Sequence, residues 1–194
     1  MLRDKLKIYK VVLASGSPRR QQFLKELDVD FEVRLKEVEE IYPDTLKGAE
    51  ITDYLAELKA AGMMETLSDD EILITSDTIV WHEGKALGKP TDYEDAFAML
   101  KTLSGKTHEV ITSVCIKTLL KTELFNETTK VTFNTLSDEE IKYYLDNYKP
   151  FDKSGSYGIQ EWIGLVAIAK IEGSHANVVG MPVDKVYQHL SKFA

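Results

Sequence analysis

The spacing of apolar residues predicts two helices and a strand in the first third of the chain. Helical spacing runs from Pro18 to about Leu27, and apolar and polar residues alternate over 31–35. A second helical stripe comprises Ile51, Tyr54, Leu55, Leu58 and Gly62. We therefore predict a helix, a strand and a longer helix, in that order.

The longest strand candidate runs from Ile72 to Trp81. It is apolar at odd and even positions on either side of a polar centre. Both faces of such a strand are covered, which predicts a central place in the sheet. A turn and a short return strand follow over 82–88. Thr91 and Glu94 then form a capping box that begins a third helix.

Two β-rich runs in the second half predict a long antiparallel hairpin. They cover 107–118 and 122–136 and are joined by a short turn. Ser137 and Glu140 form another capping box, which begins a helix that stops before Pro150.

The last elements are an apolar strand over 164–171 and an amphipathic helix. That helix carries Val183, Val186, Tyr187, Leu190 and Phe193. Because no repeat or linker interrupts the series, any two lobes share the chain without a boundary between them, and we predict one domain over residues 1–194.

Composition narrows the function classes. With 43% hydrophobic and 29% charged residues, the chain is typical of a globular protein. No apolar run approaches the roughly 20 residues of a membrane span, and the start lacks a signal-peptide core, so we expect a cytoplasmic protein without a membrane partner. The single cysteine, Cys115, allows no internal disulfide and is expected to be buried.

The net charge of −8 argues against binding along a nucleic-acid backbone. It leaves a small phosphate substrate open, because salt screens charges beyond about 10 Å and a local cation cluster can dominate.

Such a cluster is predicted at the loop before the first helix. Ser17 suits the N-cap and Pro18 the first helical position, so the free N–H groups of the loop, near Ser15, face one spot. Arg19 and Arg20 follow in the first turn. This arrangement indicates a phosphate site, although a capped helix with solvated arginines is the plainer interpretation.

Asp77 lies at the polar centre of the longest strand. A carboxylate buried there costs several kcal/mol unless it is paired, hydrogen-bonded or bound to metal. It is either a buried aspartate satisfied by its neighbours or a general base or metal ligand. Thr78 points to the opposite face of an ideal strand, so both side chains serve one ligand only if the strand ends or bends there.

Further charged residues complete the candidate phosphate chemistry. Lys59 flanks the second helical stripe, and Lys89 is held extended by the proline after it. Together with the two arginines they give four cations for a polyphosphate, while Glu40 and Asp77 could hold Mg²⁺. The chain has neither a Walker A loop nor a G-x-G-x-x-G fingerprint, which argues against P-loop kinases and dinucleotide dehydrogenases.

A Gly/Ser-containing segment over 150–160 ends in Gln160. Its carboxamide offers a donor beside an acceptor, which matches the N–H and carbonyl of uracil or thymine. An unconstrained amide can also flip to fit cytosine.

Six ordered motifs resemble the Maf (septum formation) family over nearly the whole chain. They are Leu13-Ala14-Ser15-x-Ser17-Pro18-Arg19-Arg20, Leu55-Ala56-x-x-Lys59-Ala60, Ser76-Asp77-Thr78, Leu87-Gly88-Lys89-Pro90, Asp152-Lys153-x-Gly155-x-Tyr157-Gly158-Ile159-Gln160 and Asn177-Val178-Val179-Gly180-Met181-Pro182.

The resemblance implies a nucleoside triphosphate pyrophosphatase with an α/β fold related to the inosine triphosphate pyrophosphatases. We expect a central mixed twisted sheet with flanking helices, two lobes around a nucleotide cleft, a divalent metal and often a homodimer. At Arg19, Thr78 and Gln160, this sequence resembles the branch of the family that acts on dTTP and UTP. Glu161-Trp162 departs from the family, which more often places a glycine after the glutamine.

The expected reaction is hydrolysis at the α-phosphorus, with Asp77 as the base and Mg²⁺ or Mn²⁺ held partly by Glu40 and Asp77. The phosphate contacts are expected from Ser15, Ser17, Arg19, Arg20, Lys59 and Lys89. House-cleaning of nucleotide pools is the expected role.

Two alternatives remain. One keeps the chemistry but acts on other or modified triphosphates, such as 7-methyl-GTP or CTP. The other is a nucleotide-sensing regulator of cell division.

Overall fold

The computed structural model describes residues 1–193, so Ala194, the end of the predicted domain, lies outside them. The chain forms two compact units. One comprises Met1–Asp77, Thr112–Glu127 and the chain from Gly180 onward; the other comprises Thr78–Ile111 and Thr128–Val179. Each unit is thus assembled from separate segments of the chain.

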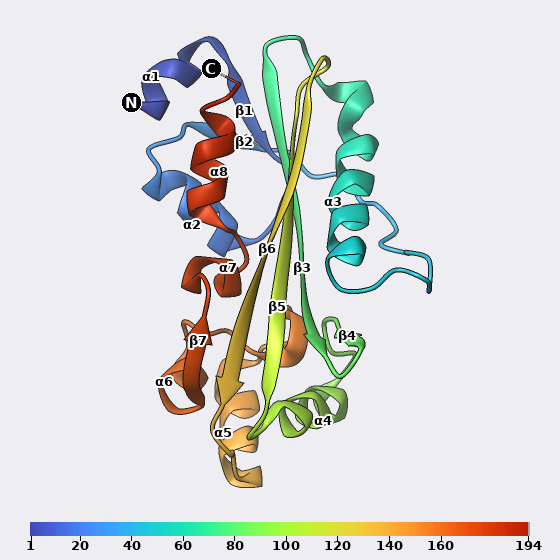
Figure 1. The fold of residues 1–194 in the computed structure, drawn as a ribbon, viewed down its shortest axis with the longest axis vertical. Coiled ribbons are helices and arrows are strands. Elements are labelled where there is room, and N and C mark those ends of the chain that lie inside the picture. The colour runs from blue at the N-terminus through green and yellow to red at the C-terminus, as the bar shows by residue number, and fades with distance from the viewer. Residues whose placement is uncertain (194) are drawn as a thin grey trace. The chain divides into compact units, whose positions relative to one another are not determined.

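Strands and helices alternate along the chain (Figure 1). The strands are β1 (Lys10–Leu13), β2 (Phe31–Val33), β3 (Glu71–His82), β4 (Lys85–Leu87), β5 (Thr107–Lys117), β6 (Thr122–Phe133) and β7 (Ile168–Glu172). The α-helices are α1 (Leu2–Lys5), α2 (Pro18–Glu26), α3 (Ala49–Met63), α4 (Tyr93–Leu103), α5 (Asp138–Tyr148), α6 (Trp162–Val166), α7 (His175–Val179) and α8 (Val183–Leu190). Short 3₁₀ turns cover Leu6–Ile8, Met64–Thr66 and Ser154–Ser156.

Within the described residues, seven strands form one mixed sheet in the order β2-β1-β3-β5-β6-β7, and β4 pairs with β3. The strand β1 is parallel to both β2 and β3, whereas the pairs β3–β4 and β6–β7 are antiparallel. This confirms the predicted central place of β3. A sheet with flanking helices confirms the predicted α/β fold.

The sheet of the first unit has two apolar faces. One face, which includes Leu13 and Ile74, packs against α2 and α8. The other, which includes Val12, Leu73 and Cys115, packs against α3 (Figure 1). Apolar residues at both parities of β1 and β3 are therefore explained by helices on each face.

The core of the second unit gathers residues from α4, α5, β5 and β6. His108, Phe133 and Tyr157 form edge-on ring contacts in it, with ring centroids 5.0 to 5.5 Å apart. Leu100 and Tyr144 are fully buried beside them. The described helices include none with the length and apolar character needed to cross a membrane.

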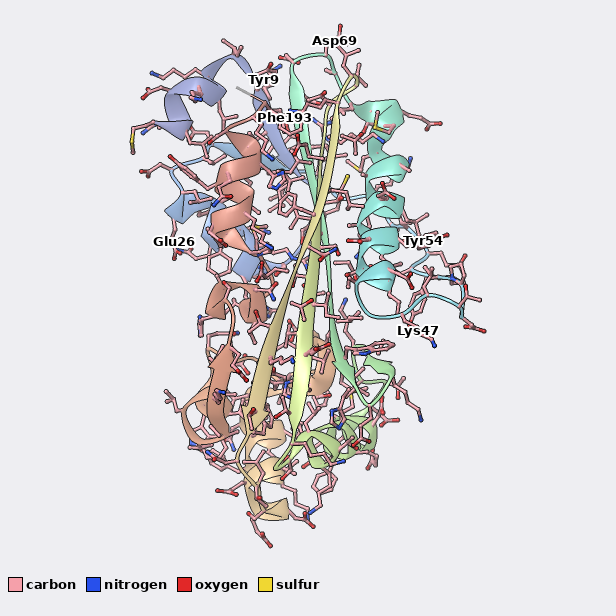
Figure 2. All side chains as sticks on the ribbon, in the orientation of Figure 1. Tyr9, Glu26, Lys47, Tyr54, Asp69 and Phe193 are labelled. Atoms are coloured by element: carbon pink, nitrogen blue, oxygen red, sulfur yellow. The ribbon has the colours of Figure 1, made fainter. Side chains whose placement is uncertain are left out.

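Most predicted elements are confirmed, but three details are wrong. Tyr54 is 39% exposed and points away from the sheet (Figure 2), because the small residues Ala56 and Ala60 form the contact face of α3. The N-cap of α4 is Asp92, whose carboxylate accepts the Asp95 N–H, rather than Thr91.

The third error concerns the apolar run 164–171. Its first part is helical, in α6, and only β7 is a strand. The apolar side chain of Leu165 is 86% exposed, so the apolar residues there do not mark a buried strand as the sequence pattern predicted. A Cβ at Gly164 would lie 1.7 Å from the Ile159 carbonyl oxygen, so the glycine permits the tight turn instead of an extended chain.

Candidate functional site

The loop between β1 and α2 leads directly into the first turn of α2. Pro18 occupies the first helical turn, as predicted. Ser17 is the N-cap residue, as predicted, but its hydroxyl makes no capping bond. The Ser17 backbone N–H donates to Ser15 Oγ at 3.3 Å. A helix whose first N–H groups lack a side-chain cap can receive an anion.

Arg20 fastens this loop to two other segments of the first unit. Its Nε donates to the Gly180 carbonyl at 2.9 Å, and its Nη1 donates to the Ser76 carbonyl at 2.9 Å and to Ser15 Oγ at 3.3 Å. Desolvation, with a smaller contribution from the Arg19 charge, lowers the pKa of the Arg20 guanidinium, while Asp77 acts in the opposite sense. Arg20 is therefore a structural clamp as well as a local positive charge.

Lys59 joins the two predicted metal-binding carboxylates. Its Nζ lies 2.7 Å from Asp77 Oδ1 and 3.1 Å from Glu40 Oε1. The Asp77 and Lys59 side chains are only 10% and 18% exposed, so the pair is formed largely out of water. Lys59 comes from α3, Asp77 from β3 and Glu40 from the loop after β2. In the sequence, Lys59 and Asp77 belong to separate motifs and Glu40 to none, and the fold brings the two carboxylates to one ammonium group.

A divalent cation fits this donor set. Two carboxylate oxygens within hydrogen-bonding distance of one nitrogen are near neighbours, and Mg²⁺ commonly takes one or two protein carboxylates with phosphate oxygens and water. Among residues 1–193, no group of three or more His, Cys, Asp or Glu side chains could hold a metal. The pair therefore suits a cation that arrives with a polyphosphate.

The loop that carries Glu40 begins at a well-anchored residue. The Arg34 guanidinium forms a two-pronged pair with Glu71, at 2.7 and 3.0 Å. Those hydrogen bonds hold the pKa of the Glu71 carboxyl at about 2. The Arg34 N–H also donates to the Leu13 carbonyl at 3.2 Å, which ties the start of the loop to β1.

Thr78, Lys89 and Gln160 belong to the second unit. There, Ser154 Oγ donates to the Thr78 carbonyl at 2.8 Å, and the Gly155 N–H donates to the Gly88 carbonyl at 3.0 Å. The sequence motifs that contain Thr78, Lys89 and Gln160 are thus bonded to one another. The strand β3 continues through Asp77 and Thr78 without ending there.

Gln160 is exposed and stands beside a group of charges that the sequence did not identify. Lys153 Nζ lies 3.1 Å from Glu161 Oε1, and the Tyr144 hydroxyl donates to Glu161 Oε2. Lys153 is in a quoted motif and Glu161 is the noted departure, but only the fold shows that they meet. The signal available in the sequence was Lys153, a charged residue within a segment of glycines and small residues.

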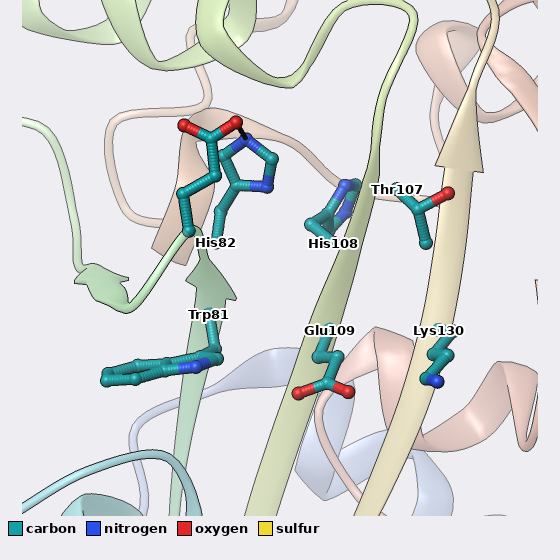
Figure 3. Close-up of a pocket in the computed structure, with 7 residues that line it drawn as sticks. Trp81, His82, Thr107, His108, Glu109 and Lys130 are labelled. Atoms are coloured by element: carbon teal, nitrogen blue, oxygen red, sulfur yellow. Dashed lines mark ion pairs between the residues drawn. The ribbon is translucent and has the colours of Figure 1, made fainter.

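A pocket of about 220 Å³ in the second unit contains none of the predicted site residues (Figure 3). It is smaller than typical ligand pockets, which span about 300–1,000 Å³. Its lining residues are Trp81, His82, Glu83, Thr107, His108, Glu109 and Lys130. We therefore do not assign the phosphate chemistry to it.

Comparison with known proteins gives a consistent result. The Maf-like protein family matches residues 10–193. The dTTP/UTP pyrophosphatase of Flavobacterium psychrophilum is 66% identical, covering 98% of this chain and 97% of the relative. The corresponding protein of Flavobacterium johnsoniae is 63% identical, with 98% of each chain covered, and that of Bacteroides fragilis is 52% identical, with 95% and 96% covered.

The Ham1 protein of Staphylococcus aureus has a similar fold, with a TM-score of 0.55 at 14% sequence identity. The match covers 95% of this chain and 100% of the Ham1 chain. It supports the α/β fold described above.

Proposed function

Because this chain belongs to the Maf-like protein family, we propose that it is a nucleoside triphosphate pyrophosphatase that hydrolyses dTTP and UTP to the monophosphate and pyrophosphate. Relatives at 52 to 66% identity over nearly the full chain carry that name. We propose that the protein acts in the cytoplasm, where these substrates occur. Its proposed role is to cleanse nucleotide pools.

The contact of Lys59 with both Asp77 and Glu40 carries the chemical part of the proposal. The Asp77 carboxylate, whose Oδ1 lies 2.7 Å from Lys59 Nζ, is the group proposed to accept the proton. The water that loses this proton attacks the α-phosphorus. The bond from the α-phosphorus to the bridging oxygen breaks, and pyrophosphate leaves with the electron pair.

The loop before α2 is proposed to bind the phosphates. The Ser15 and Ser17 hydroxyls and the N–H groups of the helix start would donate hydrogen bonds to anionic phosphate oxygens, and Arg19 and Arg20 would add positive charge. Lys59 and Lys89 are proposed to stabilise the charge that builds up on the leaving pyrophosphate.

Glu40 and Asp77 would hold a Mg²⁺ or Mn²⁺ ion. When bound, the ion would neutralise phosphate charge and polarise the phosphoryl oxygen. Asp77 and Glu40 orient toward one point because Lys59 holds both, and this ammonium preserves their geometry when no cation is present.

Base choice is proposed to rest on Arg19, Thr78 and Gln160, as the family resemblance implies. The Gln160 carboxamide would hydrogen-bond the N–H and carbonyl edge of uracil or thymine.

The test is a panel of nucleoside triphosphates incubated with Mg²⁺ or Mn²⁺, scored for pyrophosphate against orthophosphate. We expect pyrophosphate from UTP and dTTP. Equal kcat/KM for UTP and GTP would contradict the pyrimidine assignment, and orthophosphate as the product would contradict attack at the α-phosphorus.

A further inference from the structure

Gln160 is the exposed end of a buried segment in the second unit. Tyr157 and Ile159 are each 6% exposed, and Gly158 between them is buried. A residue that contacts a base needs such a support, because a freely moving side chain loses rotamer entropy on binding.

Glu161 is held at both carboxylate oxygens. Its Oε1 lies 3.1 Å from Lys153 Nζ, and its Oε2 accepts a hydrogen bond from the Tyr144 hydroxyl. The Glu161 and Lys153 side chains are only 19% and 10% exposed. We call Tyr144, Lys153 and Glu161 the Glu161 network.

Tyr144 connects this network to the backbone before Gln160. Its hydroxyl accepts the Gly158 N–H at 3.0 Å while it donates to Glu161. Burial raises the pKa of Tyr144, so the hydroxyl keeps its proton and the direction of both bonds is fixed. The carboxylate of Glu161 therefore sets the position of the Gly158 peptide.

The side chains of Gln160 and Glu161 share the space above Gly158. A Cβ at that glycine would lie 2.8 Å from Gln160 Nε2 and 3.1 Å from Glu161 Oε1. Gln160 Nε2 and Glu161 Oε1 therefore border the same space above Gly158. A carboxylate accepts hydrogen bonds only, so it favours the NH₂ end of the carboxamide as its neighbour.

We propose that Glu161 is a positioning residue that fixes the orientation of the Gln160 carboxamide and thereby selects uracil and thymine over cytosine. With Nε2 turned toward Glu161, the amide oxygen is left to accept the ring N–H of uracil or thymine. Cytosine has an unprotonated ring nitrogen at that place, which repels the oxygen. The inference rests on the proposed function and adds the group that prevents the amide from flipping.

The test compares kcat/KM for UTP with kcat/KM for CTP in Glu161→Ala, Glu161→Gln and Tyr144→Phe. The ratio does not depend on the fraction of enzyme that is folded, because both substrates meet the same enzyme. We expect the ratio to fall about tenfold in Glu161→Ala, which is the size of one hydrogen-bond preference. Glu161→Gln is expected to lose less, because its own carbonyl can still accept from the neighbouring amide.

The matched control is Glu172→Ala. Glu172 forms an exposed pair with Lys170 at 3.0 Å in the same unit, so the change of charge is the same. Its UTP-to-CTP ratio should equal that of the unmodified protein. Tyr144→Phe keeps the Glu161 charge and is expected to lower the ratio by a smaller factor.

A ratio unchanged in both Glu161→Ala and Tyr144→Phe would overturn the inference, as would an equal loss for both substrates, which indicates a purely structural role. If the unmodified protein releases no pyrophosphate from UTP or dTTP, the proposed function itself fails, and that result is obtained before any variant is made.

Discussion

Asp77 is both a buried residue and the proposed catalytic base. It is 7% exposed, and Lys59 offsets the desolvation cost of its charge. We expect Asp77→Asn to fold and to bind nucleotide but to lose about 10²–10⁴-fold in kcat, since the amide cannot take a proton. Steady-state kinetics measures the loss in kcat, and circular dichroism measures whether the variant folds.

The control for that variant is Asp70→Asn. Asp70 pairs with Lys10 at 2.9 Å in the same unit, but its side chain is 48% exposed. Its kcat should be unchanged. Turnover by Asp77→Asn at the unmodified rate would remove Asp77 as the base.

His108 makes stability depend on pH. It is 2% exposed, and burial, with a smaller contribution from His82, lowers its pKa from 6.5 to about 3. Below pH 6.5 the unfolded chain therefore binds a proton that the folded chain does not, so the free energy of unfolding falls as pH falls. From pH 7 to 5 the expected loss from this group is about 2 kcal/mol.

Urea unfolding of the unmodified protein and of His108→Gln at both pH values measures this loss. Between pH 7 and pH 5, the free energy of unfolding of His108→Gln should fall by about 2 kcal/mol less than that of the unmodified protein, whatever the stability of the variant at pH 7. Identical pH dependence in the two proteins would show that His108 has the same pKa in the folded and the unfolded chain, which would contradict the prediction.

At the scale of elements, the Arg34–Glu71 pair joins the end of β2 to the start of β3. The Glu71 side chain is 6% exposed and that of Arg34 25%. We expect Glu71→Gln to lower the free energy of unfolding at pH 7 by about 2 kcal/mol, because a buried charged partner is lost.

The lowered pKa of Glu71 fixes the pH at which this effect disappears. Its stabilisation is present above pH 4.5 and is lost as pH falls toward about 2. Urea unfolding should therefore show that the gap between Glu71→Gln and the unmodified protein narrows at pH 3. A gap that stays constant would show that the charge of Glu71 contributes nothing.

Periodicity and capping signals predict most elements because they are local. The capping box of Ser137 and Glu140 is formed with both of its hydrogen bonds. Apolar content over 164–171 predicted the strand of β7 but gave the wrong element for the first part of the run, where Gly164 approaches Ile159 closely.

At the scale of the whole molecule, the sequence identified the charged residues but not their partners. Lys59 and Asp77 were predicted from separate motifs and Glu40 as a further carboxylate, whereas their meeting depends on β3 lying beside β1 and on α3 packing against it. The Glu161 network shows the same limit, since Tyr144 lies on a helix that no quoted motif includes. Residue types are readable from sequence, and pairings require the fold.

The role of Lys59 leads to a prediction about metal and the stability of the whole molecule. The buried Asp77 carboxylate is already paired with its ammonium and the Glu40 side chain is 49% exposed, so removing a cation leaves no unpaired buried charge. We expect chelation with EDTA to abolish pyrophosphate release from UTP and to leave the melting temperature unchanged, with activity restored by Mg²⁺ or Mn²⁺.

A non-hydrolysable UTP analogue should further distinguish the protein with its cation from the protein in EDTA. With the cation present, the analogue at 100 times its dissociation constant should stabilise the folded protein by about 2.7 kcal/mol. With EDTA the gain should be smaller, because the phosphates then lack the cation that would neutralise their charge. A melting temperature that falls on chelation alone would assign the cation to the folded core instead, and full activity in EDTA would remove it from the reaction.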